Sequence, residues 1–239
     1  MKPLADCRLY AFVDTAYSHG RAPEVFAKQL CDGGADLIQL RAKKSTPDEI
    51  RRMAEAILPV TRRANVGLVI NDHPDIARET GAEFCHLGQE DFFDAGYKNV
   101  SELKKGGDGS PSRPLLGGGT SVGRLGEATL PELGIGLSTH APEQAKRALA
   151  AGPDYIAVGP VYLTSTKPMA IPVTLEYVRW AAAPQSGVNI PWFAIGGINL
   201  QTIDDVLAAG ARRICVVSAI LNAPDVMKAC MEFRRRLGD

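Results

Sequence analysis

The sequence predicts one (β/α)₈ barrel of the α/β class, a TIM barrel that spans residues 1–239. Apolar strand-like runs alternate with helical segments eight times, and the joints between helix and strand are short. A chain of 239 residues also has the length of one such barrel. An open doubly wound sheet remains an alternative, because no Gly-x-Gly-x-x-Gly turn follows the first strand to favour either fold.

Four helix-to-strand joints share one pattern, in which glycine ends a helix and an apolar run follows at once. These joints contain Gly33-Gly34, Gly81, Gly152 and Gly210. Glycine adopts positive φ without strain, so it can end a helix and turn the chain into the next element. The pattern indicates βα units with parallel strands.

The elements follow one another in strict alternation along the chain. We expect strands at residues 8–14, 36–41, 67–71, 84–88, 134–139, 154–159, 191–196 and 213–218. We expect helices at residues 22–32, 47–64, 73–80, 98–105, 142–151, 174–184, 200–209 and 224–237.

The connection between the fourth and fifth strands, residues 92–134, is unusually long and rich in glycine. It contains glycine clusters at 106–109 and 117–119. A phosphate-binding loop is disfavoured, because no Gly-Lys-Ser/Thr follows the second cluster. We interpret the segment as an extended, flexible excursion within the single domain, near the active face, where it could act as a lid.

Composition argues against several functional classes. The formal net charge is +0, so no basic field indicates nucleic acid or an anionic membrane as a partner. Arg234-Arg235-Arg236 fits the last turn of a terminal helix, where positive charge suits the helix dipole. No apolar run is long enough to cross a bilayer, and the first residues lack a signal-peptide hydrophobic region.

The five cysteines are scattered, without Cys-x-x-Cys spacing. This pattern disfavours a zinc site or a disulfide framework. We therefore expect a reduced, cytoplasmic protein that acts on small molecules. The sequence leaves the oligomeric state open, a homo-oligomer included.

The second strand carries polar residues at every second position. Gln39, Arg41 and Lys43 project from one face, while Leu40 and Ala42 face the other. An exposed edge strand with a solvated face is the simpler reading. Two cations on a packed inner face would instead require an anionic ligand.

Polar residues at the ends of the other strands favour the ligand-binding reading, because barrels build their active sites there. Arg41, Lys43, Lys167, Asn71 and Gln39 could surround a highly charged anion. Asp72 and Asp91 would repel that anion unless they hold Mg²⁺, which binds one or two carboxylates together with phosphate oxygens and water. This combination indicates a pyrophosphate, although either aspartate alone could instead cap the following helix.

A second phosphate site is expected where strands seven and eight end. Gly196-Gly197 and Val217-Ser218 lie at neighbouring strand ends, where barrels often bind a monophosphate through backbone N–H groups. Tight turn packing is the alternative role of these glycines.

The ordered motifs resemble those of the thiamine-phosphate synthase family of barrel enzymes, over nearly the whole chain outside residues 92–134. They are Gln39-x-Arg41-x-Lys43, Asn71-Asp72, Gly88-Gln89-x-Asp91, Gly136-x-Ser138-x-His140, Thr164-x-Thr166-Lys167, Gly196-Gly197-Ile198 and Val217-Ser218-Ala219-Ile220.

The resemblance implies a transferase with two substrates and a Mg²⁺ cofactor on Asp72 and Asp91. The aminopyrimidine diphosphate would contact Gln39, Leu40, Arg41, Ala42, Lys43, Asn71, Ser138 and Lys167. The thiazole phosphate would contact Thr164, Ser165, Thr166, Gly197, Val217 and Ser218. Catalysis would rest on Arg41, Lys43, Lys167 and Ser138, and the products would be thiamine phosphate and pyrophosphate.

The implied mechanism is a dissociative loss of pyrophosphate followed by capture of the carbocation by the thiazole nitrogen. It needs charge neutralisation and alignment, but no protein nucleophile.

Two other functions remain alternatives. A thiazole tautomerase shares the fold and a histidine at the position of His140, but it has little use for two aspartates beside Arg41 and Lys43. A barrel that binds thiamine precursors as a regulator could keep the phosphate site and lose its metal ligands.

Overall fold

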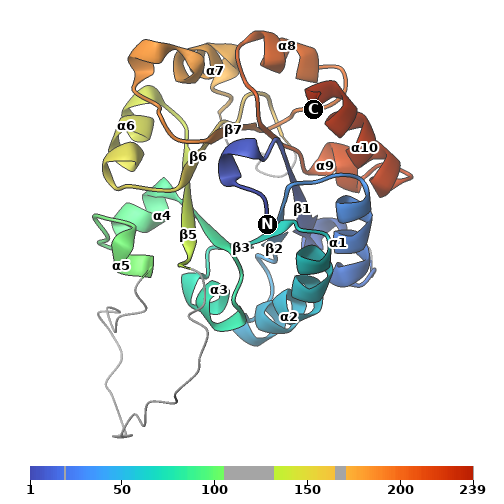
Figure 1. Ribbon diagram of the computed structural model, residues 1–239. Helices are drawn as coiled ribbons and strands as arrows, with labels where there is room; N and C mark the ends of the chain where they lie inside the picture. The colour runs from blue at the N-terminus through green and yellow to red at the C-terminus, as the bar shows by residue number, and fades with distance from the viewer. Residues whose placement is uncertain (19, 105–131, 165–170, 239) are drawn as a thin grey trace, which may run out of the picture.

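Eight parallel strands close into a barrel in sequence order, β1 to β8, with helices around it (Figure 1). The computed structural model describes residues 1–18, 20–104, 132–164 and 171–238. The predicted (β/α)₈ barrel is thereby confirmed, and the open sheet is excluded because β1 pairs with β8.

The strands are β1 Leu9–Asp14, β2 Leu37–Arg41, β3 Gly67–Asn71, β4 Phe84–Gly88, β5 Gly134–Thr139, β6 Tyr155–Val158, β7 Trp192–Ile195 and β8 Ile214–Cys215. The α-helices are α1 Pro23–Asp32, α2 Pro47–Arg63, α3 Pro74–Thr80, α4 Gln89–Asp94, α5 Ser101–Lys104, α6 Pro142–Ala150, α7 Thr174–Ala182, α8 Ile203–Ala208, α9 Ser218–Leu221 and α10 Val226–Leu237. Three 3₁₀ turns, η1 Leu4–Asp6, η2 Thr15–Tyr17 and η3 Pro184–Ser186, complete the described elements.

Two short helices were not predicted. Helix α4 begins directly after β4, with Glu90 and Asp91 in its first turn, where negative charge favours a helix N-terminus. Helix α9 begins at Ser218, so β8 is much shorter than the expected strand at 213–218. Both helices are too short to show a helical period in the sequence.

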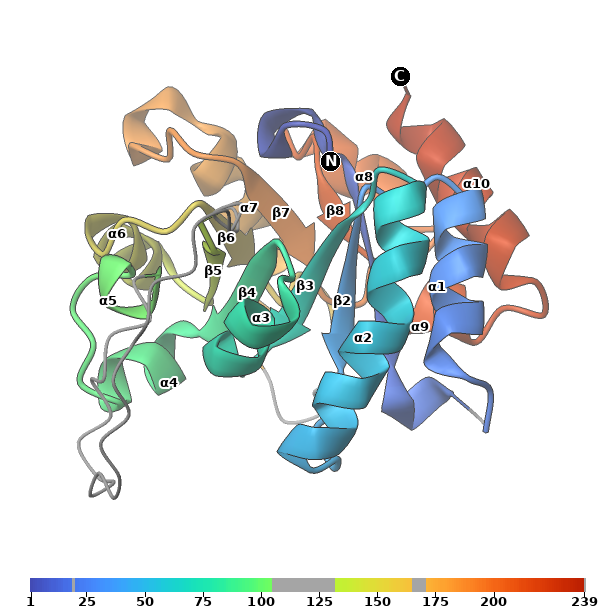
Figure 2. The ribbon, with the colours of Figure 1, turned by 60° about the horizontal axis from the view of Figure 1, so that its bottom comes forward.

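Helix α2 shows how the sequence sets a boundary. Thr46 caps its N-terminus in a capping box with Glu49, and Pro47 occupies the first turn, where its missing N–H costs nothing. The apolar face of the helix buries Ile50, Ala54 and Ile57 among other residues. Helices α1, α2 and α10 stand side by side along one flank of the barrel (Figure 2).

Aromatic rings fill the barrel interior. The Tyr10 ring lies 5.4 Å from the Phe193 ring and 6.0 Å from the Tyr155 ring, between centroids. Strand β5 makes room for them with glycine. A Cβ atom added to Gly136 would lie 2.1 Å from Tyr155 Cζ, and one added to Gly134 would lie 2.2 Å from Phe84. The rings therefore lie against bare backbone, and they form the floor of the cavity above them.

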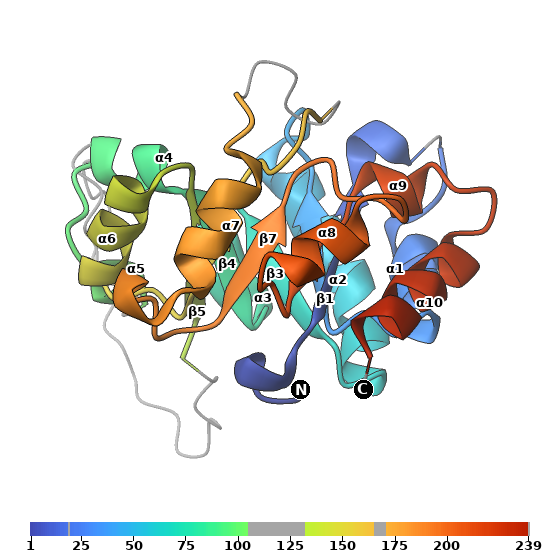
Figure 3. The same cartoon turned by 90° about the horizontal axis from the view of Figure 1, so that it is seen from above.

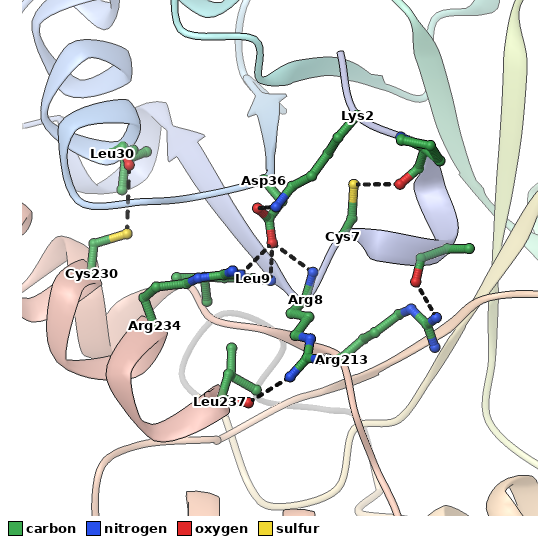
Figure 4. Close-up of polar contacts among 12 residues, drawn as sticks. Lys2, Cys7, Arg8, Leu9, Leu30, Asp36, Arg213, Cys230, Arg234 and Leu237 are labelled. Carbon is green, nitrogen blue, oxygen red and sulfur yellow. Dashed lines mark hydrogen bonds and ion pairs between the residues drawn. The ribbon is translucent and has the colours of Figure 1, made fainter. Parts of the chain in front are cut away.

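The amino-terminal end of the barrel is closed around the buried carboxylate of Asp36 (Figure 4). This carboxylate accepts hydrogen bonds from the backbone N–H groups of Arg8 and Leu9 and from the Arg234 guanidinium at 2.9 Å, and it pairs with Lys2. One side chain thus joins the start of the chain, β1 and α10. Figure 3 shows η1 and the last turn of α10 at this same end of the barrel.

The predicted excursion at 92–134 lies largely outside the described residues. The described residues that border its undescribed part, Lys104 on one side and residues 132–134 on the other, lie at the amino-terminal end of the barrel. Lys104 Nζ is 3.0 Å from the carboxylate of Asp154, which lies just before β6, and the same carboxylate accepts from the N–H of Ile135 in β5. This border therefore lies away from the active face that the sequence suggested, whereas helix α4, in which the predicted excursion starts, begins at that face.

All five cysteines lie in the described part of the chain, and none forms a disulfide. Burial raises the pKa of the Cys31 thiol to about 11 and that of Cys7 to about 12. Among the described residues, no helix combines the length and the apolar character that crossing a membrane requires.

Candidate active site

A pocket opens where the barrel strands end, at the face opposite Asp36. Eight of the predicted site residues line it together. These are Gln39, Arg41, Asn71, Ser138, Thr164, Gly197, Val217 and Ser218. As predicted, residues at the ends of several strands therefore line one cavity.

Strand β2 supplies Gln39 and Arg41 to the inner face. Gln39 is buried at 2% exposure, and its Nε2 donates to the Tyr10 hydroxyl at 2.6 Å. Leu40 and Ala42 are buried on the outer face, so only their backbone could approach a ligand in the pocket. The alternation predicted for this strand holds through Arg41, and an exposed edge strand is excluded because β2 pairs with both β1 and β3.

Lys43 lies beyond the end of β2, in the turn that leads to α2. Its side chain is half exposed, does not line the pocket, and pairs with the carboxylate of Asp72. Asp72 also accepts a hydrogen bond from Asn71 Nδ2 at 2.6 Å. The polar residues that follow β2 and β3 therefore contact one another.

The two aspartates follow neighbouring strands. Asp72 comes directly after β3 and Asp91 lies in the first turn of α4, after β4. The Oδ2 atom of Asp91 lies 2.6 Å from the position that a Cβ atom on Gly88 would occupy. Neither aspartate is a helix N-cap residue, since His73 and Gly88 hold those positions. The capping alternative is therefore wrong for both.

The donor chemistry at this position fits Mg²⁺. Both side chains offer hard oxygen ligands at the active face, and Mg²⁺ in phosphate sites commonly uses one or two carboxylates. Among the described residues, no cluster of three or more His, Cys, Asp or Glu side chains could hold a metal ion by itself. A site at this position would need ligand oxygens from substrate or water.

The opposite side of the pocket is built from close-approaching backbone. Gly196 and Gly197 follow β7 with φ values of 102° and 66°. A Cβ on Gly196 would lie 2.3 Å from Pro160 Cβ, and one on Gly197 would lie 2.5 Å from the Leu163 carbonyl oxygen. Turn packing alone therefore requires glycine at both positions, and it also leaves backbone exposed to the pocket. Ser165, Thr166 and Lys167 lie outside the described residues.

Three interior side chains were not predicted as site residues: Tyr10, His86 and Tyr155. The Tyr10 and Tyr155 hydroxyls lie 3.1 Å apart, and Tyr155 lies 3.1 Å from His86 Nδ1. His86 Nε2 lies 2.8 Å from Ser138 Oγ. A histidine inside an otherwise apolar strand, at 84–88, was the signal in the sequence that could have drawn attention to this group.

Burial raises the pKa of both Tyr10 and Tyr155 well above the ordinary value, so each keeps its proton. His140 also lines the pocket, and its Nδ1 contacts the Gly159 carbonyl. Its backbone N–H donates to Gln144 Oε1 at 2.7 Å.

Comparison with a family model decides the relationship of the chain to known proteins. The thiamine monophosphate synthase model matches residues 9–102 and 119–220, which include all the described residues that line the pocket. The chain belongs to this family. Membership makes it an enzyme of the transferase class, as the motifs predicted.

Individual relatives agree with the family. The chain is 42% identical over 205 residues to thiamine-phosphate synthase of Thermus thermophilus, covering 86% of this chain and 84% of the relative. It is 38% identical over 235 residues to thiamine-phosphate synthase of Acidothermus cellulolyticus, covering 98% and 96%.

A solved structure gives the same result. Thiamine phosphate pyrophosphorylase from Pyrococcus furiosus matches with a TM-score of 0.76 and 27% identity, covering 98% of this chain and 96% of the other. Orotidine 5'-phosphate decarboxylase from Pyrococcus horikoshii, at 16% identity and a TM-score of 0.61, shares the fold alone.

Proposed function

We propose that this enzyme joins an aminopyrimidine methyl diphosphate to a thiazole phosphate, giving thiamine phosphate and pyrophosphate. The observation that carries the proposal is the pocket itself. Polar side chains from β2, β3 and β5 line one side of it, and the glycine backbone after β7 lines another. The two sides match a charged diphosphate substrate and a smaller monophosphate, and the family relatives carry the name of this activity.

The proposed reaction is an exchange at one methylene carbon. The bond from this carbon to the diphosphate oxygen breaks, and its electron pair leaves with pyrophosphate. The lone pair of the thiazole nitrogen then forms the new carbon–nitrogen bond. No protein nucleophile takes part, so the enzyme must stabilise charge on the leaving group and align the second substrate.

Arg41 and Lys43 are proposed to meet the negative charge that develops on the leaving diphosphate, and Lys167 is proposed to join them. Ser138 and Gln39 are proposed to orient the pyrimidine ring, with Asn71 between them on β3. Thr164, Ser165 and Thr166, with the backbone at Gly197, Val217 and Ser218, are proposed to hold the thiazole phosphate.

Asp72 and Asp91 are proposed to hold Mg²⁺, which would supply further positive charge at the diphosphate when bound. The Asp72 carboxylate already pairs with Lys43 through one of its oxygens, so a Mg²⁺ ion held by Asp72 would lie close to the ammonium group that is proposed to meet the diphosphate.

The direct test mixes the purified enzyme with both substrates and Mg²⁺ and measures pyrophosphate release. Release with formation of thiamine phosphate is expected. Binding of thiazole phosphate without release would instead support a regulator, and conversion of the thiazole alone would support a tautomerase.

The metal assignment has its own test in two variants of helix α4. Asp91→Ala should abolish most turnover and weaken binding of Mg²⁺ with pyrophosphate in calorimetry, while binding of thiazole phosphate stays near that of the wild type. Asp94→Ala, an exposed change in the same helix, is the matched control and should leave both unchanged. Equal losses of turnover and thiazole phosphate binding in Asp91→Ala would contradict the assignment.

A further inference from the structure

A continuous series of hydrogen-bonded side chains runs under the pocket and connects two of the proposed pyrimidine contacts, Gln39 and Ser138. It crosses five strands, and each neighbouring pair lies within hydrogen-bond distance. In order, its members are Gln39, Tyr10, Tyr155, His86 and Ser138. Four of the five are at most 7% exposed, so bulk water does not compete for their hydrogen bonds.

The direction of each hydrogen bond follows from the first. Gln39 Nε2 donates to the Tyr10 hydroxyl, so the Tyr10 oxygen is an acceptor there. Tyr10 is 1% exposed and needs an acceptor for its own proton, which the Tyr155 oxygen provides at 3.1 Å. Tyr155 has then used its oxygen as an acceptor, and its proton goes to His86 Nδ1.

The same reasoning gives the direction of the hydrogen bond between His86 and Ser138. A neutral imidazole that accepts at Nδ1 carries its proton on Nε2. His86 Nε2 therefore donates to Ser138 Oγ at 2.8 Å, and the Ser138 hydroxyl proton remains for a ligand. At the near end, the amide nitrogen of Gln39 is engaged, so Gln39 can offer its Oε1 atom as an acceptor to the pocket.

We propose that this series of hydrogen bonds runs in one direction and thereby sets substrate specificity. Tyr10, Tyr155 and His86 are positioning residues, which leave Gln39 as an acceptor and Ser138 as a donor for the ligand. The ligand class that matches is a heteroaromatic ring with an amino N–H for Gln39 and an unprotonated ring nitrogen for Ser138. An aminopyrimidine has this pattern, and an oxopyrimidine with a protonated ring nitrogen has the reverse. The inference rests on the proposed function for the identity of the ring.

The first experiment reads the polarity without turnover. Enzyme labelled with ¹⁵N-histidine is studied by long-range ¹H–¹⁵N NMR at neutral pH, and the His86 signals are assigned by single histidine replacements. The Nε2–H tautomer is expected. An Nδ1–H tautomer or a doubly protonated ring would overturn the inference, because Ser138 would then donate to the histidine or the chain would lose its direction.

The second experiment breaks the chain at Tyr155→Phe, which keeps the ring that stacks 5.5 Å from His86 and removes only the hydroxyl. The KM for the aminopyrimidine diphosphate should rise about tenfold, the factor expected for one lost hydrogen bond, while the KM for thiazole phosphate stays unchanged. The preference for the aminopyrimidine over its 4-oxo analogue should shrink by a similar factor, and the His86 tautomer should become mixed.

Tyr177→Phe is the matched control, because Tyr177 is also buried and donates to Thr139 Oγ1 at 2.7 Å, outside the chain. Equal effects of the two variants, or an unchanged analogue preference in Tyr155→Phe, would overturn the inference. The proposed function fails separately: an enzyme that releases no pyrophosphate disproves the activity, whereas an active enzyme with the Nδ1–H tautomer disproves only the polarised chain.

Discussion

The guanidinium of Arg41 lies 2.7 Å from the carboxylate of Asp14, and the two residues stand opposite each other in the register of β1 and β2. The second oxygen of Asp14 accepts a hydrogen bond from the N–H of Ala16 at 2.9 Å. The Asp14 side chain is 2% exposed and that of Arg41 is 15% exposed. Arg41 is therefore held in one direction at the pocket wall before any ligand binds.

Asp14→Asn should lower kcat about tenfold, because an amide cannot hold the guanidinium in place as a carboxylate does. The charge that Arg41 must meet grows as the diphosphate departs, so the loss should appear in kcat more than in the KM for thiazole phosphate. Steady-state kinetics with each substrate varied in turn measure both quantities.

The control for this prediction is Asp32→Asn, which breaks an exposed ion pair with Lys28 in α1. It should leave kcat unchanged, since exposed pairs contribute little. A rise of activity in Asp14→Asn would contradict the positioning role, because it would mean that Asp14 mainly cancels useful positive charge.

Gly136→Ala should destabilise the enzyme by about 1–3 kcal/mol, the range for overpacking a well-packed interior. The new methyl group would overlap the Tyr155 ring, which has no space to withdraw among its aromatic neighbours. Urea denaturation followed by circular dichroism measures the change in unfolding free energy. A variant as stable as the wild type would show that the barrel interior is looser than its contacts indicate.

Asp36→Ala should lower the unfolding free energy by about 3–5 kcal/mol, the usual cost of removing one partner from a buried charged group. It leaves two backbone N–H groups and the Arg234 guanidinium without their acceptor. Asp204→Ala removes an exposed aspartate from its pair with Arg236 and serves as the control, with little expected change. Similar losses in both variants would contradict the central role of Asp36.

Stability should fall as the pH rises above 9, because burial, assisted by the Asp36 carboxylate, raises the pKa of the Cys7 thiol from 9.0 to about 12. The unfolded thiol loses its proton first, so the unfolded state binds fewer protons between these values. The contribution is complete below pH 9 and is lost as the pH rises toward 12. Urea titrations at several alkaline pH values should give a shallower decline for Cys7→Ala, and parallel curves would refute the assignment.

The sequence predicted the barrel well because the strands are apolar runs bounded by glycine turns. It also predicted which strand ends meet, since parallel strands in a closed barrel bring their carboxyl ends together. Gln39, Asn71 and Ser138 could be assigned to one pocket on this basis alone. The proposed roles of Asp72 and Asp91 stay predictions.

Other features could not be predicted, because they depend on contacts between distant strands. Tyr10 and Tyr155 looked like ordinary core residues, and nothing in their local sequence indicates that their hydroxyls meet. The pairing of Asp14 with Arg41 depends on the register of β1 against β2, which the sequence does not fix. Short α4 and α9 follow from turns at strand ends and have too few residues for a periodic pattern.

The contacts of Asp36 also bear on how this enzyme can be re-engineered. Lys2 and Arg234 reach the same carboxylate, so the beginning of the chain and its final helix are anchored beside each other, remote from the ligand cavity. A circular permutant that joins these regions through a short linker, with new termini in an exposed loop, should keep the cavity walls intact. Affinity tags fused at either terminus would extend from that anchored end.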